Sequence, residues 1–256
     1  MAALPRLLAL IAGLWLAAAS GAAAGPFSDW SAVVVAGDWH AHDGGPSEAF
    51  DNARRDVSLA LERAGFQDAN IRQFSVRPER YQDTHPGKTS LPAIQRALGE
   101  LSAQAPGGCL FYISSHGAPQ GAVLDQSILL PGTLANLLDQ SCGQRPTVVV
   151  ISACFSGVFV PTLARPNRMV LTAARPDRTS FGCGQDDKYP YFDDCFLSSM
   201  TDAHDFQALA GEVRECVRKR EIAEKVSPPS EPQVWVGARL RPMLPLYAFD
   251  RAEKTD

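Results

Sequence analysis

Short, continuous runs of apolar and β-branched residues are the feature that most constrains how this chain folds. Thr147–Ser152 (TVVVIS) is one of them, and it lacks the polar alternation of a strand with one solvated face. Amphipathic helical patterns lie between the runs, which is the strand–helix–strand order of α/β proteins. We therefore predict an α/β fold, a three-layer α/β/α sandwich with a mostly parallel sheet.

The predicted elements alternate along most of the chain, and the last strand is expected at an edge of the sheet. The predicted strands are Ala32–Ala36, Ile71–Val76, Cys109–Ser114, Thr147–Ser152, Met169–Thr172 and Gln233–Leu240. The predicted helices are Glu48–Ala64, Leu91–Gln104, Thr133–Gln140, Phe192–Met200 and Phe206–Lys225.

The N-terminal segment has the composition of a secretory signal peptide. Arg6 precedes the apolar run Leu7–Ala19, whose 13 residues are too few for a membrane span, and Ala22–Ala24 fits the small-residue pattern of a cleavage site. We predict a signal peptide at residues 1–24 and a single domain at residues 25–256. The mature protein is then expected to be secreted or periplasmic, without stable insertion in the membrane.

The charge balance argues against a nucleic-acid-binding protein. The chain has a formal net charge of -4 and a pI near 5.7, whereas nucleic-acid binding requires a basic face. Its basic cluster, Arg214–Lys225, mixes Lys and Arg with Glu, which is typical of a solvated helix surface. We therefore expect no nucleic-acid partner.

Two residues with catalytic chemistry follow consecutive buried strands of the predicted sheet. His116 comes just after Cys109–Ser114, and Cys154 comes just after Thr147–Ser152, 38 residues later. Ligands of doubly wound sheets bind outside the carboxyl ends of the strands. Adjacent parallel strands lie about 4.8 Å apart, so we expect the imidazole and the thiol to share one crevice.

A thiol beside an imidazole is the arrangement of a cysteine nucleophile and its base. Cys154 is the candidate nucleophile, and His116 is the candidate base and acid. The backbone N–H groups of Gly117 and Cys154 are candidate donors to an oxyanion, because a glycine lets the backbone approach a substrate closely. Gly157 is expected to let the chain turn sharply away from its strand.

Both strand ends resemble the active-site segments of the legumain (hemoglobinase) family of cysteine peptidases. Phe111–Gly117 (FYISSHG) and Val149–Gly157 (VVISACFSG) match the family's His-Gly and Ala-Cys-x-Ser-Gly motifs, and the similarity extends over residues 31–200. It implies a caspase-like fold without metal or organic cofactor. It also implies endopeptidase hydrolysis of a protein or peptide substrate, or transamidation, through a His116–Cys154 dyad.

A third block, Leu171–Phe181, resembles the strand and loop that line the primary specificity pocket of this family. The Arg-His pair that the family carries after its first strand is missing, so a preference for asparagine does not transfer. Asp38 and Asp194 are acidic residues that we expect to face the pocket and to favour a basic side chain. The substrate-binding candidates are therefore Asp38, Ser152, Thr179, Ser180 and Asp194.

Other functions compete with a peptidase. A catalytically silent binding module of the cell envelope is the main alternative, although a complete motif set disfavours it. A metal site would need His40, His42 and Asp43 to recruit His85 or His204, and no zinc motif occurs, so we predict none. A thiol redox protein is disfavoured because the chain has no Cys-x-x-Cys.

The other five cysteines bear on the predicted secretion of the protein, because secreted proteins use disulfides. Two candidate pairs follow from their positions in the predicted fold, Cys109–Cys142 and Cys183–Cys195. Cys216 would then stay free on a helix. Connectivity cannot be deduced from sequence, and a bridge that included Cys154 would count against catalysis.

Overall fold

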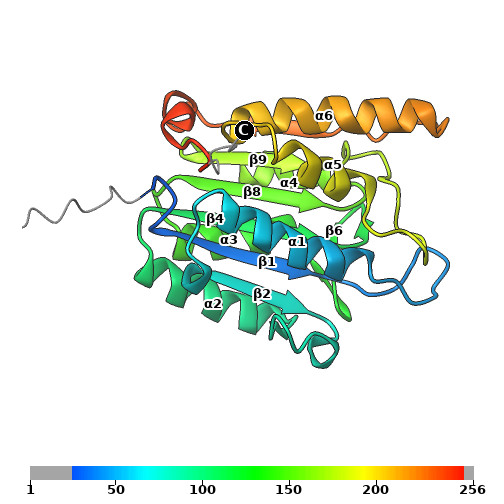
Figure 1. The fold of residues 1–256 in the computed structure, drawn as a ribbon, viewed down its shortest axis with the longest axis horizontal. Coiled ribbons are helices and arrows are strands. Elements are labelled where there is room, and N and C mark those ends of the chain that lie inside the picture. Colours follow the sequence, from blue (N-terminus) through cyan, green and yellow to red (C-terminus); the bar gives the residue numbers. More distant parts are fainter. Residues whose placement is uncertain (1–24, 251–256) are drawn as a thin grey trace, which may run out of the picture.

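The computed structural model describes residues 25–250, which are built around a seven-stranded sheet (Figure 1). The strand order is β10-β9-β8-β4-β1-β2-β3, and every neighbouring pair is parallel except β10 with β9. This is the predicted mostly parallel sheet, with the predicted last strand at its edge. The strands are β1 (Trp30–Ala36), β2 (Ile71–Ser75), β3 (Gly87–Lys88), β4 (Gly108–Ser114), β8 (Thr147–Ser152), β9 (Arg168–Thr172) and β10 (Gln233–Val236).

Helices cover both faces of this sheet, which explains why the central strands are apolar at consecutive positions. In β1, Val34 belongs to the apolar core on the face that α1, α5 and α6 cover, whereas Val33 and Val35 belong to the core on the face that α2, α3 and α4 cover. All three side chains are fully buried. The predicted three-layer sandwich is confirmed. The α-helices are α1 (Ala49–Arg63), α2 (Leu91–Gln104), α3 (Pro131–Ser141), α4 (Phe159–Leu163), α5 (Tyr191–Ser199) and α6 (Phe206–Ala223); 3₁₀ turns lie at Asp68–Asn70, Pro78–Arg80, Ser156–Val158 and Arg241–Leu246.

The chain segment between β4 and α3 forms a small antiparallel sheet that the sequence pattern did not predict. It consists of β5 (Gly117–Ala118), β6 (Gly121–Leu124) and β7 (Ser127–Leu129). Strands of this length are too short to show a period of two residues. Because β5 begins directly after His116, the small sheet fixes the chain on the C-terminal side of that histidine.

The predicted edge strand Gln233–Leu240 is too long, because β10 ends at Val236. The Gly237 N–H donates to the Arg168 carbonyl oxygen at 2.8 Å, and a Cβ at position 237 would lie 2.2 Å from the Arg165 carbonyl oxygen. The chain turns at this glycine, since only a residue without a side chain fits so close to another backbone.

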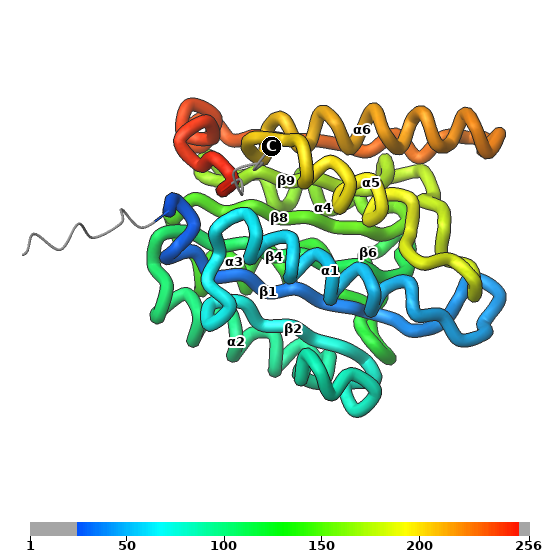
Figure 2. Tube along the Cα trace, viewed as in Figure 1, coloured from blue at the N-terminus to red at the C-terminus, as the bar shows by residue number. Residues whose placement is uncertain are grey.

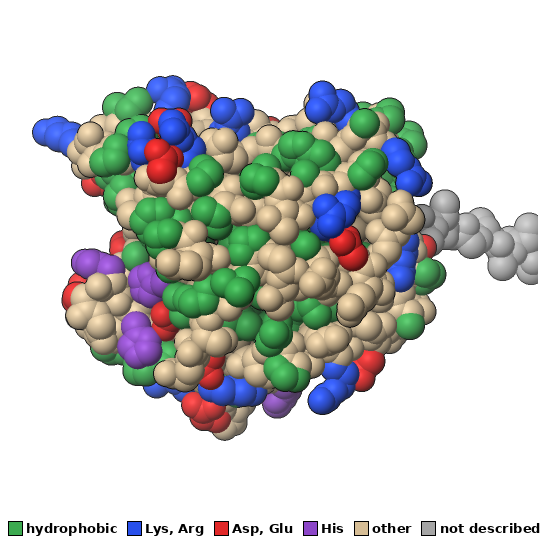
Figure 3. Space-filling view, turned by 180° about the vertical axis from the view of Figure 1, so that it is seen from behind, with side chains coloured by type: hydrophobic (Ala, Val, Ile, Leu, Met, Phe, Trp, Pro, Cys, Tyr) green, Lys and Arg blue, Asp and Glu red, His purple; other side chains and the backbone are tan. Residues whose placement is uncertain are grey.

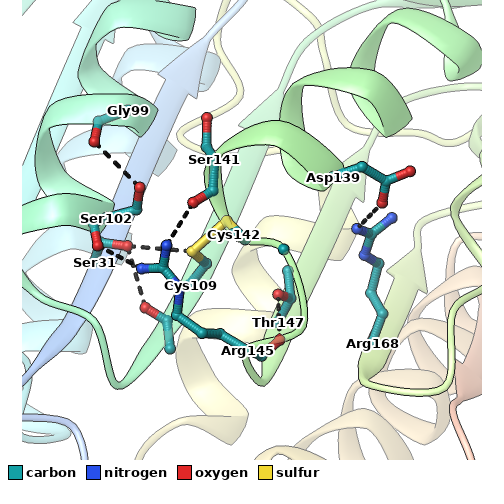
Figure 4. Close-up of a disulfide and its surroundings, with 12 residues drawn as sticks. Ser31, Gly99, Ser102, Cys109, Asp139, Ser141, Cys142, Arg145, Thr147 and Arg168 are labelled. Carbon is teal, nitrogen blue, oxygen red and sulfur yellow. Dashed lines mark hydrogen bonds and ion pairs between the residues drawn. A yellow bond between two sulfur atoms is a disulfide. The ribbon is translucent and has the colours of Figure 1, made fainter.

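The predicted disulfide Cys109–Cys142 is present and joins the start of β4 to the end of α3 (Figure 4). Arg145 lies beside it and donates to the carbonyl oxygens of Ser102 in α2 and Ser141 in α3. This arginine ties the loop that precedes β8 to α2 and α3, and the bridge ties α3 to β4.

The predicted pair Cys183–Cys195 is wrong, because Cys195 is bonded to Cys216. Cys195 lies on the face of α5 that packs against α6, where Cys216 is within reach, so Cys216 is not free as we expected. Cys183 lies instead in the loop before α5, where its carbonyl oxygen accepts a hydrogen bond from the His42 N–H at 3.1 Å. Cys183 and Cys154 are both free thiols.

The predicted signal peptide, residues 1–24, lies outside the described residues. In residues 25–250 no helix has the length and apolar character needed to cross a membrane. The two ends of the described chain meet at the amino end of the sheet, where the rings of Phe27 and Phe249 are 5.8 Å apart. The candidate site at the carboxyl ends of the strands is therefore remote from both.

Candidate active site

The carboxyl ends of β1, β4 and β8 bring three loops together at one end of the sheet. β4 lies between β1 and β8, and the chain leaves β1 for the face of α1 and β4 for the face of α3. Such a reversal is the point at which doubly wound sheets bind ligands. Histidine side chains gather beside a hollow at this end of the molecule (Figure 3).

Cys154 sits on a tight turn between β8 and the 3₁₀ turn Ser156–Val158. Phe155 adopts left-handed backbone angles (φ 57°, ψ 11°), which cost a non-glycine residue about 1–2 kcal/mol. Its N–H donates to the Arg178 carbonyl oxygen at 2.7 Å, which offsets part of that cost. The turn presents the partly exposed Cys154 thiol at the end of the strand.

The sequence suggested that Gly157 makes this turn, but the residue with left-handed backbone angles is Phe155. Gly157 instead permits a close approach, since a Cβ at position 157 would lie 2.5 Å from Pro176 Cδ and 2.6 Å from Pro176 N. Pro176 belongs to the loop after β9, so the glycine brings that loop against the nucleophile turn. In the same loop, the Ser180 N–H donates to Cys154 Sγ at 3.3 Å.

One hydrogen bond and one aromatic contact hold the His116 ring. Its Nε2 lies 2.9 Å from the carbonyl oxygen of His40, and the Phe50 ring meets it edge-on with centroids 5.0 Å apart. A carbonyl oxygen can only accept, so Nε2 carries the proton and donates it. In the neutral ring Nδ1 then keeps its lone pair and can accept a proton.

The His-Gly and Ala-Cys segments touch through their backbones. β4 and β8 pair in parallel, as the sequence predicted. Gly117, next to His116, lies so near Cys154 that a Cβ at position 117 would be 1.9 Å from the Cys154 carbonyl oxygen. Within the described chain, no hydrogen bond joins the Cys154 sulfur to the His116 ring; the sulfur contacts Ser180.

The loop after β1 supplies the carbonyl group that holds His116. Asp38 Oδ1 accepts three hydrogen bonds, from Trp39 N at 2.6 Å, His40 N at 3.1 Å and His40 Nδ1 at 2.7 Å. The rings of Trp39 and His40 are 3.9 Å apart, and the Arg77 guanidinium lies 4.6 Å above the Trp39 ring. Asp38, the second residue after β1, thus fixes the conformation of the two residues that follow it.

This loop and the loop before α5 lie side by side (Figures 1 and 2). Ser47 Oγ donates to the Gly184 carbonyl oxygen at 3.1 Å, and Gln185 Nε2 donates to Asp43 Oδ2 at 2.8 Å. The second loop also holds Cys183. Burial, with Cys154 and Asp187 adding to it, raises the pKa of the Cys183 thiol to about 11, so this thiol stays protonated at neutral pH.

A buried carboxylate that the sequence did not single out lies beneath the site. Asp193 in α5 is fully buried and accepts hydrogen bonds from Ser114 Oγ at 2.9 Å, Ser152 Oγ at 2.7 Å and the Tyr112 hydroxyl. Ser114 lies in β4 and Ser152 in β8, each two residues before a candidate catalytic residue. One carboxylate therefore joins the ends of both active-site strands.

Asp193 should give the protein a measurable pH dependence of stability. Burial raises its pKa from 3.8 to about 6, although the three hydroxyl groups act in the opposite direction. An acid whose pKa is raised in the folded state stabilises the fold most at low pH, and this contribution is lost as pH rises through the folded pKa. Relative to the D193N variant, the wild type should lose on the order of 3 kcal/mol of unfolding free energy between about pH 4 and about pH 7.

Urea unfolding of the two proteins over this pH range measures the difference, and other titrating groups cancel in the comparison. D186N, at an exposed carboxylate in the loop before α5, is the matched control. A D193N difference that stayed constant across the range would contradict a raised pKa for Asp193.

The remaining predicted site residues have other contacts. The Ser152 hydroxyl is buried and occupied by Asp193, and the Asp194 carboxylate is paired with Arg220, whose guanidinium lies 4.0 Å above the Tyr191 ring. Thr179 is exposed one residue before Ser180. Among residues 25–250, no group of three or more His, Cys, Asp or Glu side chains is arranged to hold a metal ion.

Comparison with known proteins places these features in a family. The profile of the peptidase C13 family matches residues 101–233, more than half of the chain, and includes both His116 and Cys154. Among solved structures, caspase-1 from Spodoptera frugiperda matches with a TM-score of 0.58 and 14% identity, over 83% of this chain and 88% of that one. No protein with a curated description gives a significant match.

Proposed function

Since this chain belongs to the peptidase C13 family and is thereby a cysteine peptidase with a caspase-like fold, we propose that it is an endopeptidase whose nucleophile is Cys154 and whose base is His116. The observation that carries this assignment is the 2.9 Å contact between His116 Nε2 and the His40 carbonyl oxygen. It leaves Nδ1 of His116 as the atom able to accept a proton.

The proposed reaction has two halves. His116 Nδ1 takes the proton of the Cys154 thiol, and the sulfur attacks the carbonyl carbon of the scissile bond. The protonated ring then gives its proton to the leaving amine nitrogen, and an acyl-enzyme thioester remains. His116 next takes a proton from water, which attacks the thioester and releases the acid product and the thiol.

The proposed oxyanion donors are the N–H groups of Gly117 and Cys154. Val123 N donates to the His116 carbonyl oxygen at 2.9 Å, and Gly117 lies opposite Ala122 as the next pair along the ladder. Hydrogen-bonded and non-bonded pairs alternate in an antiparallel ladder, so the Gly117 N–H is directed away from β6. It is therefore available to a substrate oxygen.

Substrate contacts are proposed for the loop that borders the nucleophile. Ser180 contacts Cys154 Sγ directly, and Thr179 is exposed beside it. We further propose that the protein acts outside the cytoplasm, after removal of residues 1–24. Its two disulfides support this location, because such bonds persist in oxidising compartments.

The test combines a peptide library with covalent labelling of the purified protein that begins at Gly25. We expect internal peptide bonds to be cleaved, and an electrophilic peptidyl probe to modify Cys154. Cys183 should remain unlabelled at neutral pH, because its raised pKa keeps it a thiol. Mass spectrometry of the tryptic peptides identifies the labelled residue. If the protein neither cleaved peptides nor reacted with the probe, the result would support a silent binding module. Products joined to an added amine would support a transamidase.

A further inference from the structure

Asp38 lies at the start of the loop after β1, where the backbone is held by hydrogen bonds on both sides. It follows Gly37, whose N–H donates to the Ser114 carbonyl oxygen at 2.9 Å and whose own oxygen accepts from Asp125 N at 2.7 Å. The backbone that enters the loop is thus attached to β4 on one side and to the end of the small sheet on the other. The Asp38 side chain is only 13% exposed.

A single oxygen of Asp38 binds the two residues that follow it. Oδ1 accepts the N–H groups of Trp39 and His40 and also the His40 ring nitrogen Nδ1. A side-chain acceptor that binds the next backbone N–H groups sets the local chain conformation, as in an Asx turn. The third bond fixes the His40 side chain as well, so His40 is held at both its backbone nitrogen and its ring.

In the described structure, His40 is hydrogen-bonded to His116 through its backbone carbonyl group alone, and the His40 ring binds Asp38 instead. Its oxygen accepts the Nε2 proton of His116, and this contact selects the ring tautomer and orientation. The position of the carbonyl oxygen depends on the conformation of Trp39 and His40, which Asp38 controls.

We propose that Asp38 is a positioning residue for His116, acting through the backbone carbonyl of His40. This inference rests on the proposed function of His116, and it differs from the sequence-based expectation that Asp38 selects a basic substrate side chain. The two roles depend on different properties of the carboxylate. Positioning needs an acceptor oxygen at the place of Oδ1, whereas attraction of a basic substrate needs the negative charge.

Two substitutions separate these properties. D38N keeps an acceptor oxygen and removes the charge, and D38A removes both. D38A should lower kcat about 100-fold, to the same extent for peptides with basic, neutral or acidic residues before the cleaved bond, because a misplaced catalytic group costs about that much. D38N should restore most of this loss, within about threefold of the wild type, because Asn forms the same turn.

D43A is the matched control in the same loop. Asp43 is an exposed carboxylate that binds Gly45 N at 3.0 Å and Gln185 Nε2 at 2.8 Å, and it has no contact with His40 or His116 in the described structure. Its removal should leave kcat unchanged. D38N with an increased KM for basic peptides alone would overturn the proposal in favour of substrate selection. So would a D38A variant that is as active as the wild type.

A second measurement does not depend on cleavage. Long-range ¹⁵N NMR of labelled histidines reports the tautomer of each neutral ring. The Nε2–H form of His116 should dominate in the wild type and in D38N, and the two tautomers should mix in D38A. An unchanged His116 tautomer in a folded D38A protein would overturn the proposal. If the wild type cleaved no peptide while the tautomers responded as expected, the endopeptidase proposal would fail and the positioning role would stand.

Discussion

Alanine at position 154 is expected to lower kcat/KM for every cleaved peptide by roughly 10⁴-fold or more, because no other group can form the acyl intermediate. H116A should lower it to a similar extent, since the two side chains act as one unit and their losses are not additive. The double variant should therefore be little slower than either single variant. Steady-state cleavage of a peptide chosen from the library measures all three.

C183A is the matched control for C154A. Both residues are free, partly exposed thiols at the same end of the molecule. Cys183 has a pKa raised to about 11 and no role in the proposed reaction, so its removal should change kcat/KM by less than about twofold. C154A that kept more than a small fraction of wild-type activity, or a C183A variant that lost it, would show that the nucleophile is assigned wrongly.

The mostly parallel sheet and the meeting of the His116 segment with the Cys154 turn could be predicted, because continuous apolar strands have few ways to be buried. Two consecutive strands of this kind, separated by one helix, pair in parallel, and their carboxyl ends then meet. Local residue patterns are sufficient for this prediction. They also place Cys109 and Cys142 at the opposite end of the sheet, where they are bonded.

The contacts that orient the site could not be predicted in the same way. Asp193 binds Ser114 and Ser152, which are 79 and 41 residues away in the chain, and in the sequence it is one more acidic residue at the start of a helix. The group of His40 that binds His116 is its backbone carbonyl. Every residue type has this group, so the residue type at position 40 does not indicate the contact. Long-range pairing of a buried polar group is settled by tertiary packing, which a single sequence does not encode in a local pattern.

The disulfide error has a related cause. Cys183 and Cys195 are close in sequence, and the polar loop between them suggested a disulfide that closes this loop. The packing of α5 against α6 decides the pairing instead, because it brings Cys216 to Cys195 with a Cα–Cα distance of 5.6 Å. That spacing lies in the usual range for a disulfide. Helix packing brings together residues whose separation of 21 positions gives no signal.

Gly117→Ala is expected to damage both stability and catalysis, although it adds only one methyl group. The new Cβ would lie 1.9 Å from the carbonyl oxygen of Cys154 and 2.8 Å from its carbonyl carbon and nitrogen. All three are backbone atoms, so no side chain can rotate away, and either β5 or the Cys154 turn must move. We expect a loss of about 1–3 kcal/mol in unfolding free energy. A shift of about 1 Å between the two motifs should also lower kcat/KM about 100-fold.

The control for this prediction is G99A, on the exposed face of α2, where a Cβ would meet nothing within 4 Å. Because glycine is a poor helix former, G99A should raise the unfolding free energy by about 1 kcal/mol and leave kcat/KM unchanged. Urea unfolding and steady-state cleavage of the same preparations give both quantities. If G117A kept wild-type kcat/KM while its stability fell, the backbone contact between Gly117 and Cys154 would be structural only. The oxyanion role proposed for the Gly117 N–H would then have to be abandoned, since that N–H cannot move with β5 and still face the same substrate oxygen.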